Sequence, residues 1–212
     1  MIRVATIFLV FAFIHSLTLS KKIKTLCADF FGETFMRVYF RAGYNAMSCI
    51  TAGTAFYLIH QVPDRSLWTA PVWLQWPLHA IQLAGVTFGL LAFSHLHAGE
   101  FLGLKQIARY WRRGEVAGNI EGLTTNTLVT SGVYGVVRHP MYLAGIVIFT
   151  FNPYFTRNSL TISGLADLYF LFGTFVEERR LVEVFGDRYR EHRKRVPRLI
   201  PRILHRLVQD RP

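Results

Sequence analysis

The sequence predicts an all-α membrane protein with about five transmembrane helices. Hydrophobic residues make up 51% of the chain and are gathered into long, nearly uncharged runs. A run of about 18 or more apolar residues is typical of a membrane helix. The charged residues stand between these runs, with a formal net charge of +11. The lysines and arginines flank apolar segments, so membrane topology explains the positive net charge better than binding to nucleic acid does. No nucleic-acid partner is therefore expected.

Five segments have the required composition, but the fourth is short. They cover residues 2–19, 43–60, 73–94, 141–155 and 159–176. Fifteen helical residues reach about 22 Å, whereas the hydrocarbon core is about 30 Å thick. The fourth span therefore starts earlier, tilts, crosses only in part or kinks at Pro153. In the third span, Gly85 and Gly89 form a G-x-x-x-G motif, which predicts close helix packing.

The basic residues alternate from one connection to the next. Of the 24 lysines and arginines, 21 lie in segments 20–42, 95–140 and 177–212. Cytoplasmic segments carry the excess of such residues. The distribution predicts an N-terminus outside and a C-terminus in the cytoplasm.

Residues 131–145, SGVYGVVRHPMYLAG, place three chemically distinct side chains before an apolar run. Pro140 suits the first turn of a helix, so Arg138 and His139 should stand at its cytoplasmic N-terminus. Free backbone N–H groups and a guanidinium fork at this point would bind an anionic group. The plainer alternative makes Arg138 a topology anchor and His139 an interfacial cap.

A second charged pair is expected to meet the first. Glu177 and Glu178 end the fifth span, and carboxylates there are costly unless they are paired. The short outer connection predicts that spans four and five form an antiparallel hairpin, which brings the two pairs together. Two alternatives stay open: an internal salt bridge, or a pocket with one cationic and one anionic side that suits an amino-acid zwitterion.

Other chemistries find little support in the sequence. Cys27 and Cys49 have no metal-ligand spacing, and His95 and His97 lack partners close in sequence, so no metal site is expected. There is no phosphate-binding loop and no glycine-rich strand–helix turn. Tyr134 and Tyr142 are either interfacial belt residues or rings that attract an ammonium or sulfonium group.

The segments LVTSGVYGVVRHPMYLAG and FVEERRLVEVFGDRYREHRKRVPRLIP resemble a known family. They are similar to the integral-membrane methyltransferases related to isoprenylcysteine carboxyl methyltransferase and phospholipid methyltransferases. This resemblance covers about residues 128–201 and implies S-adenosylmethionine as the methyl donor. It also implies His139 and Glu178 as catalytic residues. The cofactor-binding residues that it implies are Tyr134, Arg138, His139, Tyr142, Glu177, Glu178, Tyr189 and Arg195.

The front half is similar to the NnrU and methanethiol S-methyltransferase branch, through HSLTLSKK, FLGLKQ and RNSLT. The resemblance implies an apolar or amphipathic acceptor: a small thiol, a lipid head group or a prenylated carboxylate. It also suggests a bacterial inner membrane, with the catalytic face cytoplasmic. One alternative is an NADPH-dependent enzyme like the sterol reductases, although those carry roughly twice as many spans. The other is a non-enzymatic membrane protein of the NnrU type.

We expect residues 1–212 to form a single integral-membrane domain. Residues 1–94 would hold the first three spans, and residues 95–212 the cofactor-binding region with the hairpin and a basic tail. Apolar residues are spaced through that tail, a pattern typical of a segment on the surface of a membrane. Membrane lipid is therefore an expected partner.

Overall fold

The computed structural model describes residues 1–116 and 128–202, and most of these residues are helical. The chain divides into two compact units, one of residues 1–65 with 97–126 and one of residues 66–96 with 127–212. The third expected span thus groups with the C-terminal part of the chain.

The first unit is a set of packed helices. A buried cluster of Met36, Phe40 and Tyr44 forms its core. The Tyr44 hydroxyl lies 2.7 Å from His15 Nε2, and this contact joins the helix Phe40–His60 to the helix Ile2–Thr18. The helices of this unit are α1 (Ile2–Thr18), α2 (Lys21–Phe31), α3 (Glu33–Val38), α4 (Phe40–His60), α6 (Ala98–Phe101) and α7 (Leu104–Arg113).

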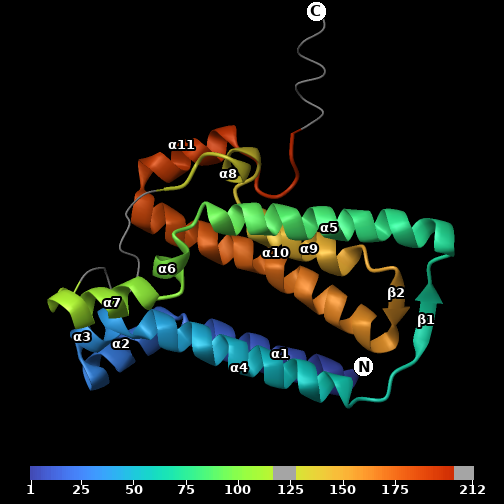
Figure 1. The fold of residues 1–212 in the computed structure, drawn as a ribbon, viewed down its shortest axis with the longest axis horizontal. Helices are drawn as coiled ribbons and strands as arrows, with labels where there is room; N and C mark the ends of the chain where they lie inside the picture. The colour runs from blue at the N-terminus through green and yellow to red at the C-terminus, as the bar shows by residue number, and fades with distance from the viewer. Residues whose placement is uncertain (117–127, 203–212) are drawn as a thin grey trace, which may run out of the picture. The chain divides into compact units, whose positions relative to one another are not determined.

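The second unit is a three-helix layer with additional segments at both ends (Figure 1). Its elements are β1 (Ser66–Thr69), α5 (Val72–Ser94), α8 (Val133–Val136), α9 (Pro140–Thr150), β2 (Tyr154–Thr156), α10 (Arg157–Phe185) and α11 (Asp187–Arg195). Helix α9 packs against both α5 and α10. The strands lie at one end of these helices, and α8 and α11 lie at the other.

Close packing at the G-x-x-x-G motif is confirmed. A methyl group on Gly85 would lie 2.9 Å from Val147 Cγ1, and one on Gly89 would lie 3.1 Å from Ala144 Cβ. Both contacts are tighter than ordinary van der Waals distance, so larger residues would push α9 away from α5. The motif therefore fixes how closely α9 approaches α5.

The expected fourth span, 141–155, is wrong in its extent. Helix α9 contains 11 residues and ends at Thr150. Its length is therefore about 16 Å, roughly half the hydrocarbon thickness. Strand β2 follows and pairs antiparallel with β1, with Trp68 opposite Phe155 and Thr69 opposite Tyr154. These two short strands were not anticipated, because their pairing joins residues that are far apart in sequence.

Within the described residues, α5 and α10 are long and apolar enough to cross a membrane. Helices α1 and α2 together would add a third span, although the pair is bent by 59°. Helix α4 has the length of a span but is less apolar. The structure therefore contains two or three candidate spans, and the expected total of about five and the orientation stay predictions.

Candidate functional site

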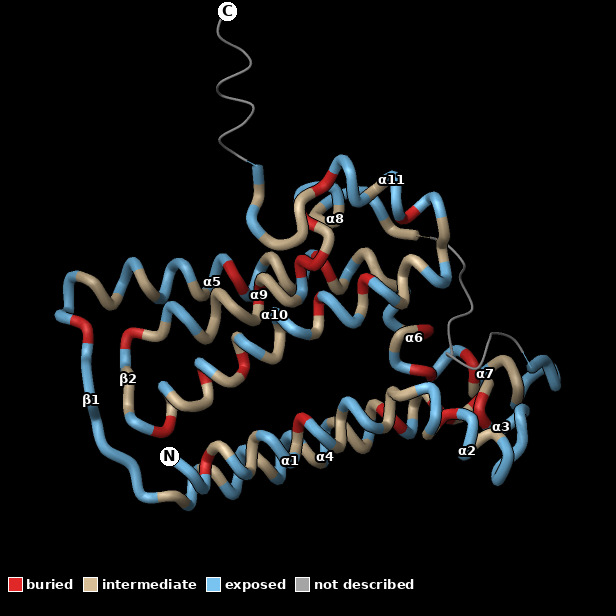
Figure 2. The backbone as a smooth tube through the Cα atoms, turned by 180° about the vertical axis from the view of Figure 1, so that it is seen from behind, coloured by how far each residue is buried: buried red, intermediate tan, exposed pale blue. Residues whose placement is uncertain are grey.

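The site is built around the start of α9. Pro140 occupies the first turn of this helix, as predicted, and His139 stands at its N-cap. Val137, His139 and Pro140 are buried, and Figure 2 shows this buried stretch where α9 begins. The chain is therefore held firmly at the point where the predicted site residues lie.

A glycine shapes the loop before α8. Gly132 has a φ of +60°, a conformation that other residues rarely adopt. A methyl group there would lie 2.1 Å from His95 Nε2. His95 stands at the C-terminal end of α5, where its Nδ1 donates a hydrogen bond to the Leu91 carbonyl at 2.7 Å. This packing anchors the loop before α8 onto α5, and α8 carries Tyr134.

Arg138 and Glu178 form a buried ion pair. Arg138 Nε donates to Glu178 Oε1 at 2.9 Å, and Nη2 donates to the same oxygen at 2.5 Å. The side chains are 9% and 5% exposed. The two charged ends of the α9–α10 hairpin therefore meet, as the sequence predicted, and an internal salt bridge joins them.

The segment that follows α11 returns to the same point. The backbone N–H of Arg138 donates to the Pro197 carbonyl at 2.9 Å, and that of His139 donates to the Arg198 carbonyl at 3.1 Å. Arg138 Nη1 also donates to the carbonyl oxygens of Arg193 and Val196. All three guanidinium nitrogens of Arg138 are therefore engaged within the protein.

Two further arginines surround Glu178. Arg198 donates to both carboxylate oxygens, with Nε 3.3 Å from Oε1 and Nη2 3.0 Å from Oε2. Its guanidinium carbon lies 3.9 Å from the centre of the Phe175 ring, a cation–π contact. Arg193 Nε lies 3.7 Å from Glu178 Oε2. Glu178 therefore contacts three cations, and two of them, Arg193 and Arg198, join the hairpin to α11 and the segment after it.

His139 lies between the two glutamates. Its Nδ1 is 3.2 Å from Glu177 Oε2, and its Nε2 is 3.4 Å from Glu178 Oε1. Nε2 is buried and has no hydrogen-bond partner among the residues that the structure describes. The ring meets Tyr142 edge-on, with centroids 5.6 Å apart. Tyr142 rests against Gly173, where an added methyl group would lie 2.8 Å from its ring.

Two tyrosines on separate elements have raised pKa values. Tyr189 on α11 is 1% exposed, and its hydroxyl has no hydrogen-bond partner within residues 1–116 and 128–202. Burial, followed by the charge of Glu178, raises the pKa of Tyr189 to about 12. Burial and the charge of Glu177 likewise raise the pKa of Tyr134 on α8 to about 12. Both hydroxyls are therefore protonated donors at neutral pH.

The structure brings most of the predicted residues together, but not Arg195. That side chain is 75% exposed and pairs with Glu191 on its own helix at 3.0 Å. Sequence reasoning missed Arg193 and Arg198, whose side chains reach Glu178 instead. The only available signal was that Arg198 directly follows the Val-Pro pair of the motif. The residues assembled here are Tyr134, Arg138, His139, Tyr142, Glu177, Glu178 and Tyr189.

Comparisons with known proteins relate the chain to membrane methyltransferases. Residues 87–188 match the family model described as phospholipid methyltransferase. Methanethiol S-methyltransferase of Pseudomonas deceptionensis is 30% identical over 171 residues, which cover 76% of this chain and 59% of the relative. Methanethiol S-methyltransferase 1 of Bradyrhizobium diazoefficiens is 28% identical over 196 residues, which cover 90% of this chain and 63% of that relative. Human protein-S-isoprenylcysteine O-methyltransferase is 38% identical over 84 residues, which cover 36% of this chain and 28% of that relative.

The fold and the site define a helical membrane protein whose polar groups converge at the base of a hairpin. Residues 87–188 match the phospholipid methyltransferase family, and the chain is similar to methanethiol and isoprenylcysteine methyltransferases. It spans about three fifths of the length of the curated relatives that it matches first. No solved structure shows a significant match.

Proposed function

We propose that this protein transfers a methyl group from S-adenosylmethionine to an apolar or amphipathic acceptor at the cytoplasmic surface of a bacterial inner membrane. One observation carries the proposal: His139, Glu177, Glu178, Tyr134 and Tyr189 converge at one end of the α9–α10 hairpin. This convergence occurs in a chain whose relatives are named methyltransferases. Neither a nicotinamide-dependent reductase nor a non-enzymatic role is favoured by those relatives.

The polar groups available in the site fit a zwitterionic donor. Glu177 is 40% exposed and keeps one carboxylate oxygen for an ammonium group. The buried Tyr189 hydroxyl and His139 Nε2 lack hydrogen-bond partners in the described part of the chain. Buried polar atoms are rarely left unpaired, so two such atoms close to the same pair of glutamates suggest a missing ligand. These three residues are the contacts that we assign to the donor.

Arg138 and Glu178 receive a different role. Binding a ligand carboxylate through Arg138 would require breaking its bonds to Glu178 and to the chain after α11. We therefore assign Arg138 and Glu178 to positioning the site. Arg193, which is 44% exposed, is better placed to meet the carboxylate of the donor.

When bound, the donor supplies an activated methyl group on a sulfonium, which is transferred by in-line displacement. The protein mainly has to align donor and acceptor, and alignment alone contributes several kcal/mol. A thiol acceptor, with a pKa near 8.5, would benefit from losing its proton first. We assign His139 Nε2 to the donor and not to this proton, because its single lone pair can serve only one partner while Glu177 holds the ring through Nδ1.

The acceptor class is proposed from the relatives, several of which are named methanethiol S-methyltransferases. A small thiol is the first candidate, and a lipid head group or a prenylated carboxylate are the others. Because the site lies at one end of apolar helices, an apolar acceptor would reach it from within the bilayer.

We further propose five membrane segments formed by α1, α4, α5, α9 and α10, with α9 crossing only in part. The distribution of 21 of the 24 basic residues over alternate segments supports a cytoplasmic C-terminus. Trp73 and Trp76, both exposed, lie near the end of α5 opposite the site, as expected of an interfacial belt.

Calorimetry on the purified protein in detergent, with S-adenosylmethionine and with NADPH, tests the cofactor. We expect binding of S-adenosylmethionine alone, weakened by His139→Ala and Glu177→Ala without loss of folding. Transfer of a radiolabelled methyl group to methanethiol or to membrane extract then tests the activity and the acceptor. Binding of NADPH alone, or of neither molecule, would overturn the proposal.

A further inference from the structure

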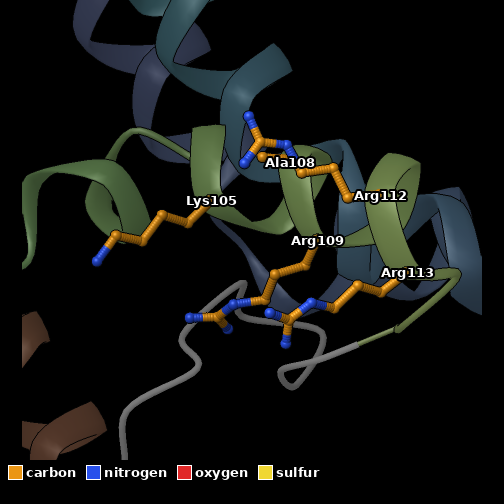
Figure 3. A pocket seen from close by; sticks show the side chains of 5 residues that line it. All are labelled: Lys105, Ala108, Arg109, Arg112 and Arg113. Atoms are coloured by element: carbon orange, nitrogen blue, oxygen red, sulfur yellow. The ribbon is translucent and has the colours of Figure 1, made fainter.

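Helix α7 of the first unit carries a row of basic side chains along a hollow (Figure 3). The described residues lining the hollow are Lys105, Ala108, Arg109, Arg112 and Arg113. Lys105, Arg109 and Arg113 are spaced four residues apart, so they share one face of the helix. In Figure 3 the side chains of Arg109 and Arg113 point the same way.

Such a row is unfavourable without a compensating anion. Like charges four residues apart destabilise a helix. The helix dipole favours Arg112 and Arg113 in the last turn, but it disfavours Lys105 in the first. Arg109 is paired with the buried Glu100 at 2.8 Å, and Arg113 lies 4.0 Å from Glu115. Lys105 and Arg112 have no carboxylate partner among the residues that the structure describes.

Large apolar side chains are exposed on another face of the same helix. Leu104 is 57% exposed and Trp111 is 77% exposed, and they stand seven residues apart on one face. The Trp111 indole N–H donates to the Tyr39 hydroxyl at 3.0 Å, which fixes the ring while leaving it open. A helix with cations on one face and Trp and Leu on another is typical of a helix lying in the membrane interface.

We propose that α7 is a binding site for an anionic phospholipid of the surrounding membrane. The phosphate of the lipid would lie in the hollow between Lys105, Arg109 and Arg113, and its acyl chains would run along Leu104 and Trp111. This site is separate from the methyl-transfer function proposed above and does not depend on it. Two features identify the occupant. The three cations favour the negative charge of a phosphodiester, and the apolar residues beside them favour acyl chains.

The test uses the full chain in nanodiscs, with Trp68, Trp73 and Trp76 replaced by Phe so that Trp111 is the only tryptophan and can be excited selectively. Quenching by brominated phosphatidylglycerol is compared with quenching by brominated phosphatidylcholine. We expect a several-fold preference for phosphatidylglycerol. The double variant Lys105→Gln/Arg113→Gln should bring this preference close to one, since each basic residue at an anionic surface contributes about a factor of five.

The matched control is Arg190→Gln/Lys194→Gln on α11, which removes the same charge from exposed side chains and should leave the preference unchanged. The charge-conserving variant Lys105→Arg/Arg113→Lys should also retain it, which separates loss of charge from loss of folding. An unchanged preference in the neutral double variant would overturn the proposal. So would displacement by inorganic phosphate at constant ionic strength, which would indicate a soluble anion as the occupant.

Discussion

Replacing Glu178 by Gln tests the different roles that the structure gives the two neighbouring glutamates. Glu178 is 5% exposed and faces Arg138, Arg198 and Arg193, so its loss leaves a buried guanidinium without its counter-charge. Removing one partner of a buried ion pair costs about 3–5 kcal/mol. We expect the lower end, about 3 kcal/mol, because the remaining donors of Arg138 still reach backbone carbonyls.

The same change at Glu177 is the internal control. That side chain is 40% exposed and makes one contact, to His139, so Glu177→Gln should cost less than about 1 kcal/mol. Affinity for S-adenosylmethionine should follow a different order: Glu177→Gln weakens it while the fold remains intact. The free energy of unfolding in mixed micelles and calorimetric binding provide the two measurements. Equal destabilisation by both variants, or none by Glu178→Gln, would contradict this division of roles.

Three further changes test the surroundings of the site. Gly132→Ala forces a methyl group onto His95 at a positive φ, so it should destabilise the protein by about 2 kcal/mol or more in denaturant unfolding, whereas Gly164→Ala, in open space, should not. Arg198→Ala loses a cation–π contact and two charged hydrogen bonds, so limited proteolysis should cut the C-terminal segment faster than in the parent protein. Burial, followed by neighbouring basic groups, lowers the pKa of His192 below 6.5, so the unfolded chain takes up this proton first and stability falls as the pH drops below 6.5. The melting temperature of His192→Gln should therefore fall less between pH 7 and pH 5 than that of the parent, and equal slopes would count against the assignment.

The hairpin and its charged base were predictable because each rests on local signals. Pro140 marks the start of a helix, and the basic and acidic pairs stand at the ends of two apolar runs joined by a short connection. Antiparallel pairing of neighbouring helices then leaves little freedom in where these ends lie. The G-x-x-x-G motif was likewise informative, because only small residues permit the approach seen at Gly85 and Gly89.

The details that were missed depend on contacts between residues distant in sequence. The pairing of β1 with β2 joins Trp68 to Phe155, and neither segment has strand alternation long enough to predict it. The choice of Arg198 rather than Arg195 depends on where α11 ends and on how the chain turns at Pro197. In a run of arginines and lysines, composition alone cannot indicate which side chain points inward.

The arrangement around Glu178 also explains why the site needs the segment after α11. Arg138 and His139 donate backbone hydrogen bonds to the carbonyl groups of residues 197 and 198, so the start of α9 is bound to the segment after α11. Glu178 then draws the arginine of that same segment, Arg198, toward α10. The backbone pairing and the ion pairs stabilise each other, since each positions the partners of the other. It follows that the orientation of His139 between its two glutamates depends on a segment about 60 residues away in sequence, and that the donor site proposed here requires this segment to be in place.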